Sequence, residues 1–303
     1  NSDRYFEYFF AVPWAGGVFV PINIRLAPPE IAFWLNDSGA EILFVDDNFL
    51  DAVKALDGKL ETVREFVYMG DGAAPDGMRA YEDMLLDPIP DAMRGYEDLA
   101  GLFYTGGTTG MPKGVMYPVK DFTEFFMRGF PSMIGLSPFE TADQMAVTAK
   151  QLFDSNATVV SMSGPPLMHG TGSWLGLMFP HMLGGTSVML ESRGLKPEEV
   201  WDAIDQHKIA QLVIVGDAFA KPLLRALEAE PDRWNTSSLR MMISSGAMFT
   251  TQVKRDLIEH IPELAIADVL GSTEGGMGQS IMTKDTPASE TAKFMLLPTS
   301  KVL

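Results

Sequence analysis

Short apolar stretches alternate with stretches of helical pattern along most of this chain of 303 residues. The predicted strands are residues 18–20, 42–45, 66–68, 186–190, 211–215, 240–243 and 265–270. The predicted helices are residues 3–16, 28–39, 48–57, 120–134, 173–183, 197–207, 218–229 and 250–260. Strand–helix alternation is typical of a largely parallel sheet covered by helices, so the sequence predicts an α/β fold.

One stretch interrupts this alternation. Residues 70–98 are dominated by Gly, Pro and Asp, which is typical of a solvated connection. The sequence therefore predicts two helix-covered, mostly parallel α/β subdomains, at about 1–98 and 120–303, with residues 99–119 forming a specialised loop between them.

Charge and composition exclude several classes of function. The net charge of −17 would repel a phosphodiester backbone, which argues against nucleic acid as a partner. Without cysteine there is no disulfide and no thiolate nucleophile, which is compatible with the cytoplasm. Neither a membrane-spanning apolar run nor a signal peptide is expected. The chain starts without Met, so we expect a fragment; a homodimer is left open.

The most specialised stretch runs from Tyr104 to Gly114, with the sequence Tyr-Thr-Gly-Gly-Thr-Thr-Gly-Met-Pro-Lys-Gly. Glycine lets a backbone approach a ligand closely, because no Cβ stands in the way. Successive free backbone N–H groups make an anion-binding concavity, to which threonine hydroxyls and Lys113 add donors and positive charge. The stretch predicts a loop that wraps a polyphosphate. Its candidate contacts are Thr105, Gly106, Gly107, Thr108, Thr109, Gly110 and Lys113.

This loop differs from the Walker A loop, in which Gly-Lys-Ser/Thr opens a helix. Here Pro112 precedes the lysine, removes a backbone donor and disfavours helix at Met111, so the loop is expected to join two strands. The alternative is an ordinary hairpin turn, although a short turn does not require so many specialised residues.

A second candidate stretch is Leu270-Gly271-Ser272-Thr273-Glu274, directly after a predicted strand. A carboxylate beside a hydroxyl at a strand end can hold Mg²⁺ on a bound phosphate, since Mg²⁺ prefers one or two carboxylates together with phosphate oxygens. The alternative is a simple glycine-rich turn with a surface glutamate.

The stretch from Tyr104 to Gly114 closely resembles the signature loop of the adenylate-forming superfamily. This superfamily comprises acyl-CoA synthetases, firefly-type luciferases and the adenylation domains of peptide synthetases. The chain as a whole resembles the family's N-terminal domain with both ends missing, and residues 16–23 resemble part of its first subdomain.

The resemblance implies roles for individual residues. The loop from Thr105 to Lys113 would hold the β- and γ-phosphates of ATP, and Thr273 would contact the α-phosphate. Glu274 would hold Mg²⁺, facing the loop across one cleft. Lys113, Thr273, Glu274 and His169 are the candidate catalytic residues.

The resemblance also implies which residues would border the adenine base. Gly246 and Ala247 resemble a segment whose backbone lies along adenine, while Met248 replaces a proline; an ordinary strand–helix loop is the alternative. The family usually has an aromatic residue where this chain has Leu270, before Gly271, so adenine would be held by packing alone or with help from Asp268.

The resemblance also implies residues that bind the acid. His169 matches a family position where an imidazole can orient the carboxylate of the substrate; a structural histidine is the alternative. Trp174, Val215, Gly216 and Gly246 are candidates to line the acyl pocket. For Trp174 a place in the core is the alternative.

The implied reaction joins a carboxylic acid to ATP as acyl-AMP and then to coenzyme A. Within the family, the exact residues of both motifs are most similar to those of acyl-CoA synthetases for long-chain fatty or sterol side-chain acids. The alternatives are an aryl-acid ligase, an amino-acid adenylation domain, and a non-catalytic nucleotide-binding module. The family's ribose-binding Asp and the lysine of its C-terminal domain have no counterpart here, so we expect poor turnover from this chain.

Overall fold

The computed structural model describes residues 1–85, 95, 97–106, 111–129, 131, 136–192, 194–286, 291, 293–297 and 300. The chain divides into two compact units, Glu7–Phe122 and a second one made of Asn1–Phe6 with Thr123–Leu303. Helix α1 (Asp3–Trp14) and helix α5 (Val119–Glu124) each contain the chain's passage from one unit to the other.

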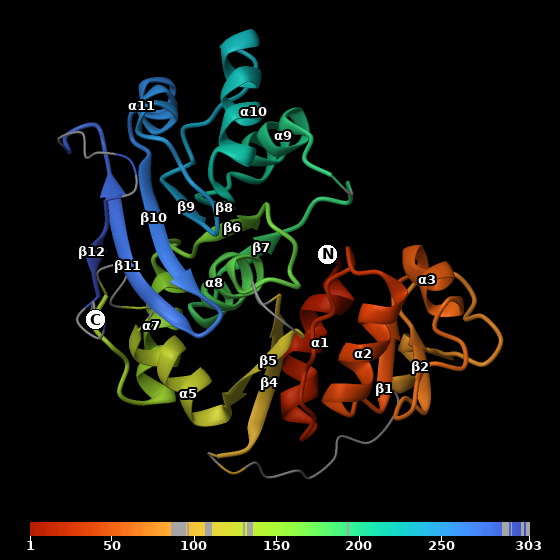
Figure 1. Ribbon diagram of the computed structural model, residues 1–303. Coiled ribbons are helices and arrows are strands. Elements are labelled where there is room, and N and C mark those ends of the chain that lie inside the picture. The colour runs from red at the N-terminus through yellow and green to blue at the C-terminus, as the bar shows by residue number, and fades with distance from the viewer. Residues whose placement is uncertain are drawn as a thin grey trace. The chain divides into compact units, whose positions relative to one another are not determined.

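The unit Glu7–Phe122 contains two small sheets (Figure 1). Strands β1 (Ile42–Val45), β2 (Glu65–Tyr68) and β3 (Arg79–Ala80) are parallel, whereas β4 (Leu99–Thr105) and β5 (Lys113–Pro118) form an antiparallel pair. The helices are α2 (Pro28–Ser38), the 3₁₀ turn Asp47–Phe49, α3 (Leu50–Lys54) and α4 (Tyr81–Met84).

Helix α2 begins and ends where the sequence predicts. Pro28 suits the first helical turn, and the Glu30 carboxylate accepts a hydrogen bond from the Ala27 N–H at 2.8 Å. Gly39 ends the helix with φ +68°, a left-handed conformation that glycine adopts without strain. Ile31, Ala32 and Leu35 bury the inner face of the helix.

The strand predicted at residues 18–20 is wrong, because only Phe19 pairs with another strand. Phe19 makes only a single parallel bridge to Gly101, with its N–H donating to Ala100 O and its carbonyl accepting from Leu102 N–H. Its ring is fully buried, and a Cβ on Gly101 would lie 2.3 Å from that ring. Packing of Phe19 against β4 explains the apolar pattern that the sequence presents as a strand.

The other unit is built on a seven-stranded sheet of order β12-β11-β10-β9-β8-β6-β7 (Figure 1). Strands β6 (Val160–Ser163), β7 (Thr186–Val188), β8 (Gln211–Ile214), β9 (Met241–Ser245) and β10 (Ala265–Ser272) are parallel. Strands β11 (Gly275–Met282) and β12 (Met295–Leu296) extend the sheet in antiparallel fashion. The α/β prediction with mostly parallel sheets is thereby confirmed.

Helices cover both faces of the parallel strands. Helices α9 (Pro197–His207), α10 (Gly216–Ala229) and α11 (Thr251–His260) pack on one face, where Trp201, Leu223 and Leu257 lie in the main core (Figure 1). The π-helical segment Thr171–Met178 packs on the other face, where Gln211 Nε2 donates a hydrogen bond of 2.9 Å to Leu175 O. Helix α8 (Phe179–Met182) continues this segment.

Several elements differ from the sequence prediction. The helix predicted at 173–183 is the π-helical segment followed by α8, and the helix predicted at 48–57 is the 3₁₀ turn followed by the short α3. In the region predicted as helix 120–134, α5 is followed directly by the π-helix Phe125–Gly129. Helix α7 (Ala142–Asp154) and strands β3, β6, β11 and β12 were not predicted. Among the described residues, no helix has the length and hydropathy needed to cross a bilayer.

Candidate nucleotide site

The carboxyl ends of three adjacent parallel strands bring several predicted residues to one edge of the large sheet. Ile214 of β8 is paired with Ser244 of β9, and Ser244 is paired with Asp268 of β10. The chain leaves these strands at Gly216, Gly246 and the turn after Ser272, respectively. In open α/β sheets this edge is where ligands bind.

Thr273 and Glu274 form the tight turn between β10 and β11, because Ser272 and Gly275 on either side are paired with each other. A register shift after Leu270 displaces the end of β10, and a Cβ on Gly271 would lie 3.2 Å from Gly275 O. The Ser272 hydroxyl donates to the Glu274 carboxylate and holds its pKa below the usual range. The turn therefore presents an exposed, ionised carboxylate next to the Thr273 hydroxyl.

The loop after β9 is tied to the start of α10. Gly246 has φ +89° and Gly216 has φ +50°, conformations that favour glycine. A Cβ on Gly216 would lie 2.3 Å from Met248 O, and the Asp217 N–H donates to the same carbonyl at 2.9 Å. The Asp217 carboxylate in turn accepts from Thr250 N–H at 2.9 Å. These contacts fix the backbone at Gly246 and Ala247 independently of any ligand.

Asp268 has a partner that the sequence did not reveal. Its carboxylate accepts a hydrogen bond from Lys254 Nζ of α11 at 2.7 Å, and both side chains are buried. Burial raises the pKa of Asp268, and the Lys254 charge opposes that rise. This ion pair is by itself sufficient reason for a buried carboxylate in β10. The contact of Asp268 with adenine stays a prediction.

The predicted acid-binding residues lie at the same edge of the sheet or on the face beside it. His169 lies in the turn after β6, where its carbonyl accepts from the N–H groups of Gly172 and Ser173, and its side chain is exposed. Trp174 is half-buried, with its ring 5.8 Å from that of Phe125. Val215 lies beside Gly246, where a Cβ would come within 3.8 Å of Val215 Cγ1.

The glycine-rich loop belongs to the unit Glu7–Phe122 and, as predicted, joins two strands. Thr105 ends β4, Lys113 begins β5, and the two residues are paired. The Lys113 side chain and Gly106 are exposed. The remaining predicted contacts, Gly107, Thr108, Thr109 and Gly110, lie outside the described residues.

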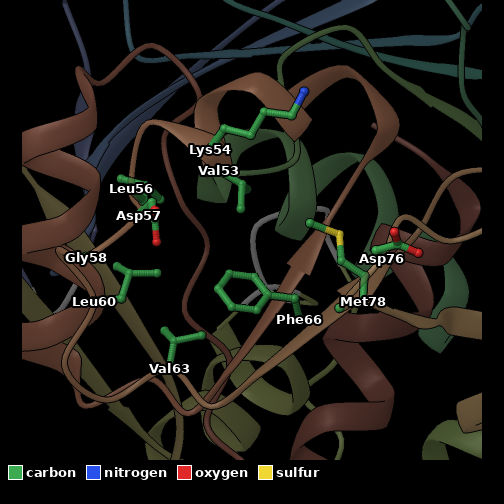
Figure 2. Close-up of a pocket in the computed structure, with 11 residues that line it drawn as sticks. Val53, Lys54, Leu56, Asp57, Gly58, Leu60, Val63, Phe66, Asp76 and Met78 are labelled. Carbon is green, nitrogen blue, oxygen red and sulfur yellow. The ribbon is translucent and has the colours of Figure 1, made fainter.

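Within the unit Glu7–Phe122 the structure also contains a pocket of about 480 Å³, between α3, β2 and the segment at residues 76–78 (Figure 2). Apolar side chains such as Val63, Phe66 and Met78 line it together with Asp57 and Asp76. None of the predicted site residues contributes to it, so we do not assign the nucleotide site to this pocket.

Ser272 and Lys254 support the candidate site and were missed as functional residues. Ser272 stands two positions before Glu274 across a tight turn, a spacing that a closer reading of the motif could have used. Lys254 is 14 residues from Asp268 along the chain, and only the sheet and α11 bring the two together.

The class of protein is an α/β nucleotide-binding protein. Its large sheet carries glycine loops and a Thr-Glu turn at the carboxyl edge, and the same chain contains a glycine-rich loop between two strands. The chain belongs to the AMP-binding enzyme family, whose profile matches residues 1–297.

Relatives and structures agree with this assignment. The chain is 31% identical over 283 residues to a medium/long-chain-fatty-acid–CoA/3-oxocholest-4-en-26-oate–CoA ligase of Mycolicibacterium smegmatis, covering 89% of this chain and 49% of the relative. It is 30% identical to a 3-oxocholest-4-en-26-oate–CoA ligase of Rhodococcus rhodochrous, covering 92% of this chain and 50% of the relative. The chain thus spans about half the length of these curated relatives.

The fold matches that of the anthranilate CoA ligase AuaEII, solved with anthranoyl-AMP, with a TM-score of 0.72 at 24% identity. That match covers 95% of this chain and 52% of the other. A Mycobacterium smegmatis MbtA structure matches with the same TM-score of 0.72 at 22% identity, covering 95% of this chain and 48% of the other. At such identities these matches support the fold.

Proposed function

We propose that this chain binds ATP and a carboxylic acid in an acyl-CoA synthetase, which forms acyl-AMP and then transfers the acyl group to coenzyme A. The observation that carries the proposal is the Thr273–Glu274 turn, which holds an ionised carboxylate and a hydroxyl at the end of β10, next to the strand that Gly246 follows. Family membership and the signature loop from Thr105 to Lys113 add support.

The chemistry is a displacement at phosphorus. A carboxylate oxygen of the acid bonds to the α-phosphorus of ATP while the bond to the bridging oxygen breaks and pyrophosphate leaves. The thiolate of coenzyme A then bonds to the acyl carbon and AMP leaves. No covalent bond to the protein is required, so the protein positions the reactants and stabilises developing charge.

Each candidate residue has a task in this scheme. The backbone around Thr105 and Gly106 and the ammonium group of Lys113 bind the β- and γ-phosphates, and the Thr273 hydroxyl binds the α-phosphate. Gly246, Ala247, Leu270 and Gly271 border the adenine, with Asp268 behind them. His169 orients the carboxylate of the acid, while Trp174, Val215 and Gly216 contact its acyl part.

The residues present fit a Mg²⁺ ion carried by the nucleotide. Glu274 is exposed and ionised, and the described residues contain no cluster of three or more acidic, histidine or cysteine side chains that could hold a metal alone. Mg²⁺ commonly takes one carboxylate together with phosphate oxygens and water. Bound in this way, the ion would offset negative charge on the phosphates.

The names of the relatives favour long-chain fatty acids or sterol side-chain acids as substrates. We further propose a cytoplasmic location, with which a chain free of cysteine is compatible, and a homodimer, which light scattering would test.

The test is a substrate panel read by the release of pyrophosphate and AMP with ATP, Mg²⁺ and coenzyme A present. Even at the low turnover expected of this chain, palmitate and a cholestenoate should give more product than benzoate, anthranilate or any amino acid. Lys113→Ala should weaken ATP binding, whereas the control Lys120→Ala should not. A preference for aryl acids or amino acids would contradict the substrate class. Unchanged ATP affinity in Lys113→Ala would contradict the phosphate loop itself.

A further inference from the structure

The residue that enters the glycine-rich loop is fixed by two side chains of α2. Tyr104 immediately precedes Thr105 in β4, and its ring stacks on that of Trp34 with centroids 4.8 Å apart and an interplanar angle of 20°. The Tyr104 hydroxyl donates a hydrogen bond of 2.5 Å to the Asp37 carboxylate. Trp34 and Asp37 are three positions apart on α2 and therefore share one side of that helix.

The helix behind these contacts is partly buried and capped at both ends. Trp34 is 4% exposed, and α2 is held by its capped ends and by the burial of Leu35 beneath it. Burial of the Tyr104 ring, followed by the hydrogen bond to Asp37, raises the pKa of Tyr104, so the hydroxyl keeps its proton and remains a donor at neutral pH. A short bond from a neutral donor to a carboxylate is among the stronger hydrogen bonds in proteins.

The neighbouring residue of β4 is fixed from the opposite face. Because successive side chains of a strand point to opposite faces, Phe103 lies across the strand from Tyr104. Its ring contacts those of Phe19 at 5.6 Å and Tyr117 at 5.5 Å. The end of β4 is thus held on both faces, directly before the loop.

Both ends of the loop depend on this anchor. Tyr104 is paired with Gly114, and Thr105 is paired with Lys113. A shift of Tyr104 would therefore move the Thr105 and Gly106 backbone at one end and the Lys113 ammonium at the other. Groups that bind a charged ligand lose much of their effect when they are displaced by about 1 Å.

We propose that Tyr104, held by Trp34 and Asp37, is a positioning residue for the loop, keeping Thr105, Gly106 and Lys113 in the arrangement that binds the β- and γ-phosphates of ATP. This inference rests on the proposed function, because it assumes that the loop binds those phosphates.

The test compares ATP with AMP, which lacks the β- and γ-phosphates. Tyr104→Phe removes the hydrogen bond and keeps the stacked ring. It should weaken ATP binding by about five- to tenfold, the effect of losing one such bond. AMP binding should change less than about twofold, because no contact of AMP depends on the loop. Isothermal titration calorimetry of the purified chain measures both affinities.

Matched variants separate positioning from general stability. Tyr68→Phe removes a comparable bond, from the Tyr68 hydroxyl to Asp47 at 2.8 Å in the same unit, and should leave both affinities unchanged. Asp37→Ala should reproduce the loss seen in Tyr104→Phe, and the double variant should be no worse than either single variant.

Two results would overturn the inference: equal losses of ATP and AMP affinity in Tyr104→Phe, or unchanged ATP affinity in that variant while Lys113→Ala weakens ATP. Failure of the proposed function gives a different pattern, in which the unaltered chain binds ATP no more tightly than AMP and Lys113→Ala has no effect.

Discussion

At the scale of single residues, the structure separates glycines that the fold requires from one that it does not. A Cβ on Gly114 would lie 2.7 Å from Leu102 Cδ1, so a side chain at the last glycine of the signature stretch would force the Leu102 side chain to shift within the hairpin. A Cβ on Gly106 would have no described atom within 4 Å. Among the described residues neither crowding nor a positive φ accounts for Gly106, which agrees with the proposal that a phosphate approaches its backbone closely.

This contrast predicts opposite effects for two alanine substitutions. Gly114→Ala should lower the free energy of unfolding by about 1–3 kcal/mol, the usual effect of overpacking. Gly106→Ala should change it by less than about 0.5 kcal/mol and weaken ATP binding by about tenfold, through loss of a backbone contact to a charged group. Urea unfolding and calorimetric titration measure the two quantities. A destabilised Gly106→Ala with normal ATP affinity would contradict the assignment.

At the scale of elements, the sequence predicted best those helices and strands whose ends carry local determinants. Helix α9 matches at both ends: Pro197 suits its first turn, and Lys208 ends it in the left-handed conformation with φ +53°. Helix α7 was missed because none of its residues is buried; its inner face offers only half-buried side chains such as Met145 and Leu152. Strand β11 was missed because Gly275, Gly276 and Gly278 give it the pattern of a turn, which its pairing with β10 overrides.

In the candidate site, too, some features could be predicted from local sequence and others could not. The motif around Thr273 and Glu274 could be found from adjacent residues alone. The ion pair between Lys254 and Asp268 could not, because it joins α11 to β10 across the core. No local pattern in a sequence specifies such a contact.

This ion pair gives a prediction about the element that carries the Thr-Glu turn. Lys254→Met leaves the Asp268 carboxylate buried without its partner and should lower the free energy of unfolding at pH 7 by about 3–5 kcal/mol. The double variant Lys254→Met with Asp268→Leu should recover most of the loss, since an apolar pair of similar size has no charge to bury. Urea unfolding of both variants measures this; equal losses in the two would contradict it.

The pH dependence of the single variant follows from the direction of the shift. Burial already raises the folded-state pKa of Asp268 above its ordinary value of 3.8, and loss of Lys254 should raise it further. A group whose pKa is raised by folding favours the folded state at low pH and loses that contribution as pH rises through the folded-state pKa. The deficit of Lys254→Met should therefore shrink as the pH is lowered from 7 towards 5. A deficit that grows over this range would be evidence against the raised pKa.

At the scale of the whole molecule, a ligand that binds only the folded chain reports on the site through stability. Such a ligand contributes about 2.7 kcal/mol when its free concentration is one hundred times its Kd, and this appears as a rise in Tm. Because the net charge is −17, the chain should bind the ATP anion better when a cation accompanies it. Glu274 is the described residue to which we assign that cation.

We therefore expect ATP with Mg²⁺ to raise the Tm of the chain more than ATP with EDTA does. In Glu274→Gln, which keeps the shape of the side chain and removes its charge, the rise should be the same with Mg²⁺ and with EDTA. The control Glu259→Gln alters an exposed glutamate of α11 and should retain the full Mg²⁺-dependent rise. Differential scanning fluorimetry at fixed ionic strength measures all three proteins. If Glu274→Gln kept the Mg²⁺-dependent part of the shift, Glu274 would not be the residue that holds the ion, because only its carboxylate charge differs from that of the unaltered chain.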